Sequence, residues 1–170
     1  MKKWILWLGA LVVLVLVALI WIPVSFPMKK SIAAVAIKHN DPTYLASLEI
    51  VIDGQYNYYL YKRDEFYGKF AIEGMEGTNK SDTLPYLWID ETWPVPLAYQ
   101  TDDFRIYQFG SVISDQFLNH LFIGVSDAGS WDGADGTSIF APAGTRLEAK
   151  QTWEQLSKKS EWLSAVAWED

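Results

Sequence analysis

A run of apolar residues near the N-terminus constrains this chain more than any other feature of its sequence. Residues 4–22 are nineteen amino acids without a charged side chain, and Lys2, Lys3, Lys29 and Lys30 flank them. At a helical rise of about 1.5 Å per residue, the run spans roughly 30 Å, the thickness of the hydrocarbon core of a bilayer. Tryptophans stand towards both ends, where their rings favour the headgroup level. The run therefore predicts a transmembrane helix.

The apolar run is expected to be an uncleaved signal-anchor rather than a cleaved signal peptide. A cleavable signal has a shorter apolar region, of about 7–15 residues, with small residues close behind it. The nearest such site, Ala34-Val35-Ala36, lies far beyond the run. We therefore predict a single-pass protein of the cell membrane: residues 1–22 form the cytoplasmic tip and anchor, residues 23–40 a juxtamembrane linker, and residues 41–170 an extracytoplasmic domain.

The rest of the chain is acidic and free of cysteine, and both properties exclude classes of function. Residues 31–170 hold all 21 acidic residues but only 10 of the 14 lysines and arginines. Such a domain repels nucleic acid and anionic lipid headgroups. The absence of cysteine excludes disulfides, thiolate metal sites and cysteine nucleophiles. About 140 residues are enough for one domain that is held together by its packing.

Beyond residue 42, apolar residues alternate with polar ones, which is typical of half-buried strands. The Asp53-Gly54 dipeptide predicts a hairpin turn, and glycines inside later strands indicate places where a sheet bends. Strands are expected over residues 44–53, 55–62, 66–73, 84–90, 95–100, 104–113 and 117–125. Short strands at this spacing predict a mainly antiparallel β domain, either a sandwich or a small barrel.

A helix is expected at the end of the domain. Thr145 and Glu148 have the spacing of a capping box, in which each side chain bonds to the backbone amide of the other residue. Apolar residues at helical spacing follow, at Leu147, Trp153, Leu156, Leu163 and Val166. Residues 158–160 are expected to fray or break this helix. The predicted fold class is α+β: an N-terminal transmembrane helix, then a mainly antiparallel β domain with a C-terminal helix.

A search for catalytic motifs finds none with a specific signature. The only histidines are His39 and His120, without a second ligand at metal-binding spacing, and His120 is expected on the face of a strand. The pairs Asp90-Glu91 and Asp102-Asp103 have the chemistry for acid and base work, but turns of acidic proteins usually carry solvated carboxylates. We therefore assign no catalytic, cofactor-binding or metal-binding residue, and we expect no cofactor.

One acidic loop and one set of aromatic residues each carry a hypothesis. Asp127, Asp132 and Asp135 lie in a glycine-rich stretch that could supply oxygen ligands to calcium, although it lacks the EF-hand pattern and also fits a long turn. Aromatic rings stack on sugars and other flat ligands, so the sheet could bind a glycan or peptide, although strands favour aromatics for packing anyway. These aromatic residues are Tyr56, Tyr58, Tyr59, Tyr61, Trp88, Trp93 and Trp131.

Four motifs of the sequence resemble a known kind of protein. They are Ile-Asp-Gly-x-Tyr at residues 52–56, Phe-x-Gly-Lys-Phe-x-Ile at residues 66–72, an aromatic-glycine step at residues 109–117 and a Trp-to-Ala run at residues 131–149. Together with the N-terminal run, they resemble an uncharacterised family of small single-pass membrane proteins from Gram-positive spore-forming bacteria. The resemblance implies an anchored β-rich domain with no established activity or catalytic residues.

These observations favour a non-enzymatic function. We expect a membrane-anchored, extracytoplasmic interaction or sensing module that meets an envelope protein or glycan and binds no nucleic acid. The alternative is an envelope enzyme that uses the carboxylates between Asp127 and Asp135. A third hypothesis is an accessory subunit whose transmembrane helix recognises a partner, for which Gly9 and Ala10 offer a small-residue face.

Overall fold

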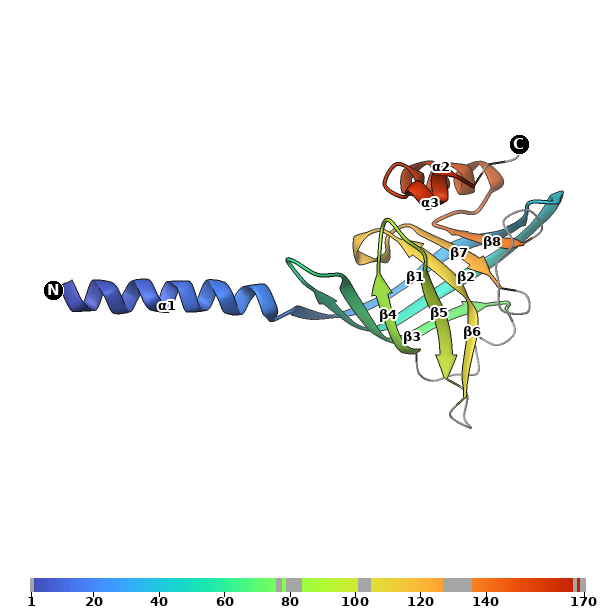
Figure 1. Cartoon of the computed structure of the whole chain (residues 1–170). Helices are drawn as coiled ribbons and strands as arrows, with labels where there is room; N and C mark the ends of the chain where they lie inside the picture. Colours follow the sequence, from blue (N-terminus) through green and yellow to red (C-terminus); the bar gives the residue numbers. More distant parts are fainter. Residues whose placement is uncertain are drawn as a thin grey trace.

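One antiparallel sheet makes up most of the fold (Figure 1). Along each strand, successive side chains point to opposite faces of this sheet. The computed structural model describes residues 2–75, 78, 84–100, 105–126, 136–166 and 168. Within these residues, the strands are β1 (Val24–Lys38), β2 (Asp41–Tyr58), β3 (Asp64–Glu73), β4 (Leu84–Ile89), β5 (Val95–Gln100), β6 (Ile106–Ser114), β7 (Leu121–Val125) and β8 (Thr137–Ala141).

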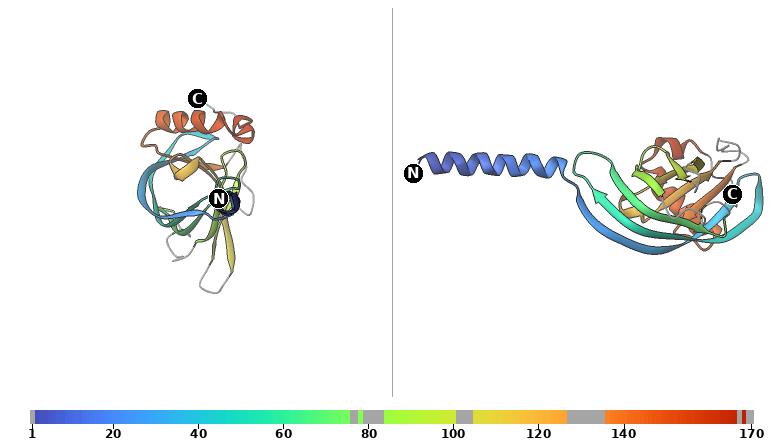
Figure 2. Two further views of the ribbon diagram at one scale, coloured as in Figure 1. Left: turned by 90° about the vertical axis from the view of Figure 1, so that its left-hand side faces the viewer. Right: turned by 90° about the horizontal axis from the view of Figure 1, so that it is seen from below.

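The strands follow one another around the sheet in their order along the chain. The spatial order is β4-β3-β2-β1-β8-β7-β6-β5, and β1 pairs with β8 through residues 35–38. The two edge strands, β4 and β5, lie against each other, with no backbone ladder between their described residues. The sheet therefore curves into a nearly closed barrel (Figure 2).

Large side chains fill the interior of the barrel. Tyr56, Phe66, Phe70 and Tyr99 point inward and are at most 2% exposed. The Tyr99 hydroxyl on β5 donates a hydrogen bond to the backbone oxygen of Phe70 on β3, at 2.8 Å. This bond links the two ends of the sheet, where β4 and β5 meet without a backbone ladder between their described residues. Burial of this kind contributes about 1.5–3 kcal/mol for each large apolar side chain.

A second core lies outside the barrel, where the C-terminal helices cover β1, β7 and β8 (Figure 1). The helices are α2 (Arg146–Ser157) and α3 (Glu161–Ser164). Val35 and Phe140 point outward from the sheet and pack with Leu156 and Leu163 of the helices. The predicted capping box at the start of α2 is confirmed: Thr145 Oγ1 accepts from the Glu148 amide at 3.2 Å, and Glu148 accepts from the Thr145 amide at 3.1 Å.

The predicted transmembrane signal-anchor is wrong. Residues 2–21 do form a helix, α1 (Lys2–Trp21), which projects away from the sheet (Figure 1). Within the described part of the chain, however, no helix has both the length and the apolar character that a membrane crossing requires. The helix includes Lys2 and Lys3 and ends before Ile22, so its uncharged part is shorter than the run in the sequence. The single-pass localisation in the cell membrane, which rested on that run, is wrong with it.

The predicted α+β fold class with its transmembrane helix is also wrong, although the β-rich character is confirmed. The chain is mostly antiparallel β, in a nearly closed barrel, with an N-terminal helix and two short C-terminal helices. Residues 24–38, which the sequence analysis placed in a linker, form β1 at the centre of the sheet. Residues 34–37 of this strand are buried in succession, because the barrel interior covers one face of the sheet there and the C-terminal helices cover the other.

The predicted hairpin at Asp53-Gly54 does not form, because β2 continues through both residues to Tyr58. Gly54 lies directly opposite Gly68 of β3. A Cβ atom on Gly54 would lie 2.8 Å from the Cα of Gly68, closer than two such carbons can approach. The glycine therefore serves a close approach of two strands at a bend rather than a turn.

Lys30 joins the start of the barrel wall to the turn before β7. Its Nζ donates to the backbone oxygens of Phe117 and Leu118, at 2.5 and 2.6 Å, and to Asn119 Oδ1 at 3.3 Å. Phe117 and Leu118 have positive φ angles of 62° and 54°, which L-residues adopt at a cost. Burial lowers the pKa of Lys30, while the nearby charge of Asp115 raises it in part. This ammonium group holds an unfavourable turn in place.

Candidate functional site

Strand register places a row of polar and aromatic side chains across the outer face of four strands. Ser25 pairs with Asn57, Asn57 with Glu65, and Glu65 with Trp88, so all four lie on the same face of the sheet. Their neighbours Phe66 and Leu87 point into the barrel. The outward position therefore follows from the pleat, because successive side chains point to opposite faces.

A second row continues the same surface. Gln55 pairs with Tyr67, and the Tyr67 ring contacts Tyr86, with ring centroids 5.0 Å apart. Tyr86 contacts Trp88 at 5.1 Å, with the two rings nearly perpendicular at 87°. Together with Tyr59, which follows β2, these side chains form what we call the aromatic face, defined as Tyr59, Glu65, Tyr67, Tyr86 and Trp88.

Glu65 is the hub of the aromatic face. Its carboxylate accepts hydrogen bonds from the hydroxyls of Tyr59 at 3.0 Å and Tyr67 at 3.2 Å. It also forms an ion pair with Lys62 Nζ at 3.3 Å. Tyr86 also hydrogen bonds to Glu65, and the indole nitrogen of Trp88 donates to the Tyr86 hydroxyl. The Lys62 ammonium lies 3.8 Å from the centre of the Tyr59 ring, within cation–π range. One carboxylate thus orients all the rings.

The donors around Glu65 keep it ionised. Burial by itself raises the pKa of Glu65, but hydrogen bonds from Tyr86, Tyr59 and Lys62 outweigh it, so the pKa lies below its ordinary value. Burial, followed by the hydrogen bond to Glu65, raises the pKa of the Tyr86 hydroxyl, which therefore stays a donor. At neutral pH the hub is therefore a carboxylate beside the protonated hydroxyls of Tyr67 and Tyr86, whose pKa values are both raised.

The pKa of Glu65 predicts how its contribution to stability depends on pH. Because the folded state lowers this pKa, the carboxylate stabilises the fold above the unfolded value of about 4.3, and the contribution disappears as pH falls through the folded pKa. We expect Glu65→Gln to lower the free energy of unfolding by about 1–3 kcal/mol at pH 7, and the difference from wild type to shrink below about pH 4. Urea unfolding across this pH range measures both values.

Tyr59→Phe is the matched variant for this measurement, because it removes one donor and keeps the carboxylate. We expect a smaller loss at pH 7 for this variant than for Glu65→Gln. A difference between Glu65→Gln and wild type that stays constant from pH 7 to pH 3 would contradict the prediction.

The aromatic face is open to solvent at two of its rings. Trp88 is 47% exposed and Tyr67 is 37% exposed, and they lie on either side of Tyr86. Ser25 donates to Asn57 Oδ1 at 2.6 Å, and Gln55 lies beside them with its carboxamide on the same face. Exposed rings next to planar polar side chains offer both stacking surfaces and hydrogen-bonding groups to a ligand.

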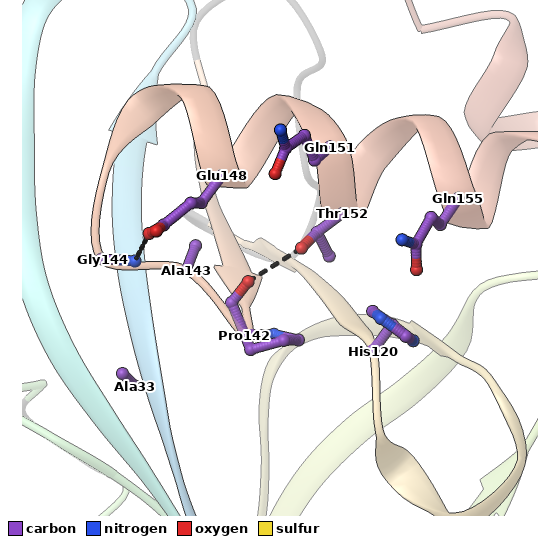
Figure 3. Close-up of a pocket in the computed structure, with 9 residues that line it drawn as sticks. All are labelled: Ala33, His120, Pro142, Ala143, Gly144, Glu148, Gln151, Thr152 and Gln155. Atoms are coloured by element: carbon purple, nitrogen blue, oxygen red, sulfur yellow. Dashed lines mark hydrogen bonds between the residues drawn. The ribbon is translucent and has the colours of Figure 1, made fainter.

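A separate pocket of about 360 Å³ lies between α2 and the sheet (Figure 3). His120 lines it from the turn before β7, and Gln151, Thr152 and Gln155 line it from α2. The Nδ1 atom of His120 lies 2.6 Å from Asp115 Oδ2. Asp115 is itself fixed, because its Oδ1 accepts from the amides of Asn119 and His120, at 2.7 and 2.8 Å. The pocket is thus lined by a histidine whose ring is held by an aspartate outside the lining, a pair that the sequence did not indicate.

Several of the histidines and carboxylates considered in the sequence make contacts that hold the fold. His120 lies in a turn rather than on a strand face. His39 is 8% exposed, with Nε2 at 3.0 Å from Ser138 Oγ. Asp90 accepts from the Thr92 and Trp93 amides and pairs with Arg63 at 2.7 Å, so it is the cap of the β4–β5 turn. Glu91 pairs with Lys159 at 2.8 Å.

The aromatic residues that were expected to bind a ligand lie in different environments. Tyr56 is fully buried in the barrel, whereas Tyr59 and Trp88 belong to the aromatic face. Tyr58 packs on Phe117, and Tyr61 and Trp93 are exposed on turns. Trp131, Asp102, Asp103 and the loop with Asp127, Asp132 and Asp135 lie outside the described residues, and so does the calcium hypothesis.

No protein-family model matches the chain, and no curated protein or solved structure matches it. The resemblance that the sequence motifs indicated is therefore untested.

Proposed function

We propose that this protein is a non-enzymatic binding module that holds a neutral glycan on the aromatic face. The single observation that carries the proposal is the arrangement around Glu65, where one buried carboxylate orients three tyrosine hydroxyls. Rings held in this way lose little conformational freedom when a ligand stacks on them, which favours binding.

The chemistry of the aromatic face fits a sugar. Each pyranose ring has apolar C–H faces and polar hydroxyls at its rim, and it therefore needs an aromatic face next to planar polar groups. Trp88 and Tyr67 supply the exposed rings, and Gln55 supplies an exposed carboxamide on the same surface. Both exposed rings stand steeply to Tyr86, at 73° and 87°, so they offer two platforms to successive sugars of a chain.

The charge of the face argues for an uncharged ligand. Glu65 is ionised, and residues 31–170 carry an excess of acidic groups. An anionic polysaccharide or nucleic acid would meet this negative field, whereas a neutral glycan would not.

Trp88→Ala tests the proposal. Calorimetric titration of the purified full chain with neutral cello- and chito-oligosaccharides should give saturable binding to wild type. Loss of the exposed ring should weaken that binding at least tenfold, because an aromatic anchor at a binding surface contributes more than about 1.4 kcal/mol. The fold should persist, since Trp88 is already half exposed.

Trp93→Ala is the matched control. Trp93 is 57% exposed on the β4–β5 turn, outside the aromatic face, so its removal should leave binding unchanged. The proposal fails if no neutral oligosaccharide binds at millimolar concentration, or if both tryptophan variants lose binding equally. Saturable binding of an extended peptide, but not of any sugar, would indicate a protein partner instead.

A further inference from the structure

The pocket beneath α2 is distant in the sheet from the aromatic face, and its chemistry is different. The aromatic face lies on β2, β3 and β4, whereas the pocket lies beside β1, the turn before β7, and the segment after β8 (Figure 3). Its floor is apolar, at Ala33, Pro142 and Ala143. Its remaining walls carry polar side chains, which decide what the pocket can bind.

The two carboxylates of the pocket region are already engaged. Asp115 is paired with His120 and with two backbone amides. Glu148 Oε2 accepts from the amides of Gly144 and Thr145, at 2.6 and 3.1 Å, and the Thr152 hydroxyl donates to the Pro142 oxygen at 2.8 Å. These groups fix the frame of the pocket, and an anionic ligand would meet two carboxylates there.

Three groups in the pocket are free to bind a ligand. In the tautomer of His120 that donates its Nδ1 proton to Asp115, 2.6 Å away, Nε2 carries the lone pair of the ring. Nε2 has no hydrogen-bond partner among the described residues, and neither do the carboxamides of Gln151 and Gln155. The two glutamines are four positions apart on α2 and lie on its pocket side (Figure 3).

We propose that this pocket binds an uncharged amide, such as a peptide bond or an acylated amine. The amide N–H donates to His120 Nε2, and the amide oxygen accepts from the carboxamide of Gln155, which lines the pocket with His120 (Figure 3). The small apolar group beside the amide lies on Ala33, Pro142 and Ala143. Asp115 is a positioning residue, because it selects the tautomer in which Nε2 is an acceptor.

Nuclear magnetic resonance of the histidine rings tests this inference directly. The full chain has only two histidines, so ¹⁵N labelling of histidine gives two sets of ring signals. Titration with N-acetyl-alanine-N-methylamide, a neutral ligand with two amides, should shift the His120 signals saturably. His39 is buried against Ser138 outside the pocket and serves as the internal reference, whose signals should not move.

Variants separate binding from a general effect on the fold. Gln155→Ala and His120→Phe should each weaken binding about fivefold, which is the size of one net hydrogen bond, in a titration that follows α2 amide signals. Asp115→Ala should also change the ring nitrogen shifts of His120 towards a mixture of tautomers before any ligand is added. Acetate, a small anion that carries the same methyl and carbonyl groups as the acetyl end of the ligand, should cause no saturable shift.

The inference is overturned if the amide ligand leaves the His120 signals unmoved, if acetate binds as well as the amide, or if Gln155→Ala binds like wild type. Failure here would not affect the glycan proposal, because Trp88→Ala leaves the pocket intact and His120→Phe leaves the aromatic face intact.

Discussion

Replacing Gly68 by alanine should destabilise the barrel by about 3 kcal/mol or more, a large part of the 5–15 kcal/mol that stabilises most domains. The φ angle of Gly68 is +141°, which L-residues rarely adopt. A Cβ atom there would lie 2.5 Å from the backbone oxygen of Asp53 and 2.5 Å from the Cα of Gly54. Both atoms belong to the backbone of β2, so no side chain can rotate away to relieve the contact.

Thermal and urea unfolding of Gly68→Ala, with Gly54→Ala as its partner across the pair, measure this effect. Gly9→Ala in α1 is the matched control, because a Cβ atom there meets nothing within 4 Å. In a helix, that substitution should be neutral or slightly stabilising. A Gly68→Ala protein as stable as Gly9→Ala would show that β2 and β3 do not approach as closely as described here.

Replacing Tyr56 by alanine should cost about 4 kcal/mol, and replacing it by phenylalanine about 1.5–3 kcal/mol. Tyr56 is fully buried and packs on Phe26 and Phe117, with ring centroids 5.3 Å away in each case. Its hydroxyl donates to Asp64 Oδ2 at 2.7 Å and accepts from the Phe117 amide at 3.1 Å. The phenylalanine variant keeps the ring but leaves a buried carboxylate oxygen and a strained amide without this partner.

Tyr58→Phe is the matched control for the Tyr56 pair, because it removes a hydroxyl from the same strand in a partly buried position beside Phe117. It should change the free energy of unfolding by no more than about 0.5 kcal/mol. Equal losses for Tyr58→Phe and Tyr56→Phe would mean that the bonds to Asp64 and Phe117 contribute nothing beyond an ordinary tyrosine hydroxyl.

Local patterns predicted the elements whose formation depends on neighbouring residues. The spacing of Thr145 and Glu148 predicted the capping box of α2, because both bonds are made within one turn. Alternation predicted β5, whose buried positions recur with a period of two. The break at residues 158–160 separates α2 from α3 as expected.

The same local patterns failed where the partner lies far along the chain. Asp53-Gly54 has the composition of a hairpin turn, but β2 continues through both residues. Gly54 pairs with Gly68 of β3, and the close approach of the two backbones leaves no room for a side chain. The apolar run of residues 4–22 predicted a membrane span that the described helices do not support. Residues 23–40 were expected to form a linker, whereas pairing with β2 and β8 places residues 24–38 in the wall of the barrel.

Both candidate sites depend on such distant partners. In the sequence, Glu65 falls between two expected strands and carries no motif. Only the pairing of β2, β3 and β4 surrounds it with Tyr59, Tyr67 and Tyr86. Asp115 and His120 are five residues apart, a spacing with no motif, and the tight turn between β6 and β7 brings them together. The high number of tyrosines in this part of the sequence indicated an aromatic surface, but nothing in the sequence indicated that Glu65 is their common partner.

Composition and short-range spacing predict a β-rich, acidic chain without disulfides and a capped helix after its strands. These properties depend on interactions over a few residues. Contacts between distant strands, in contrast, curve the sheet into a nearly closed barrel, surround one carboxylate with aromatic side chains and place a histidine in a pocket under α2. The physical reason is that strand register and close backbone approach depend on residues tens of positions apart, whose pairing no local pattern encodes.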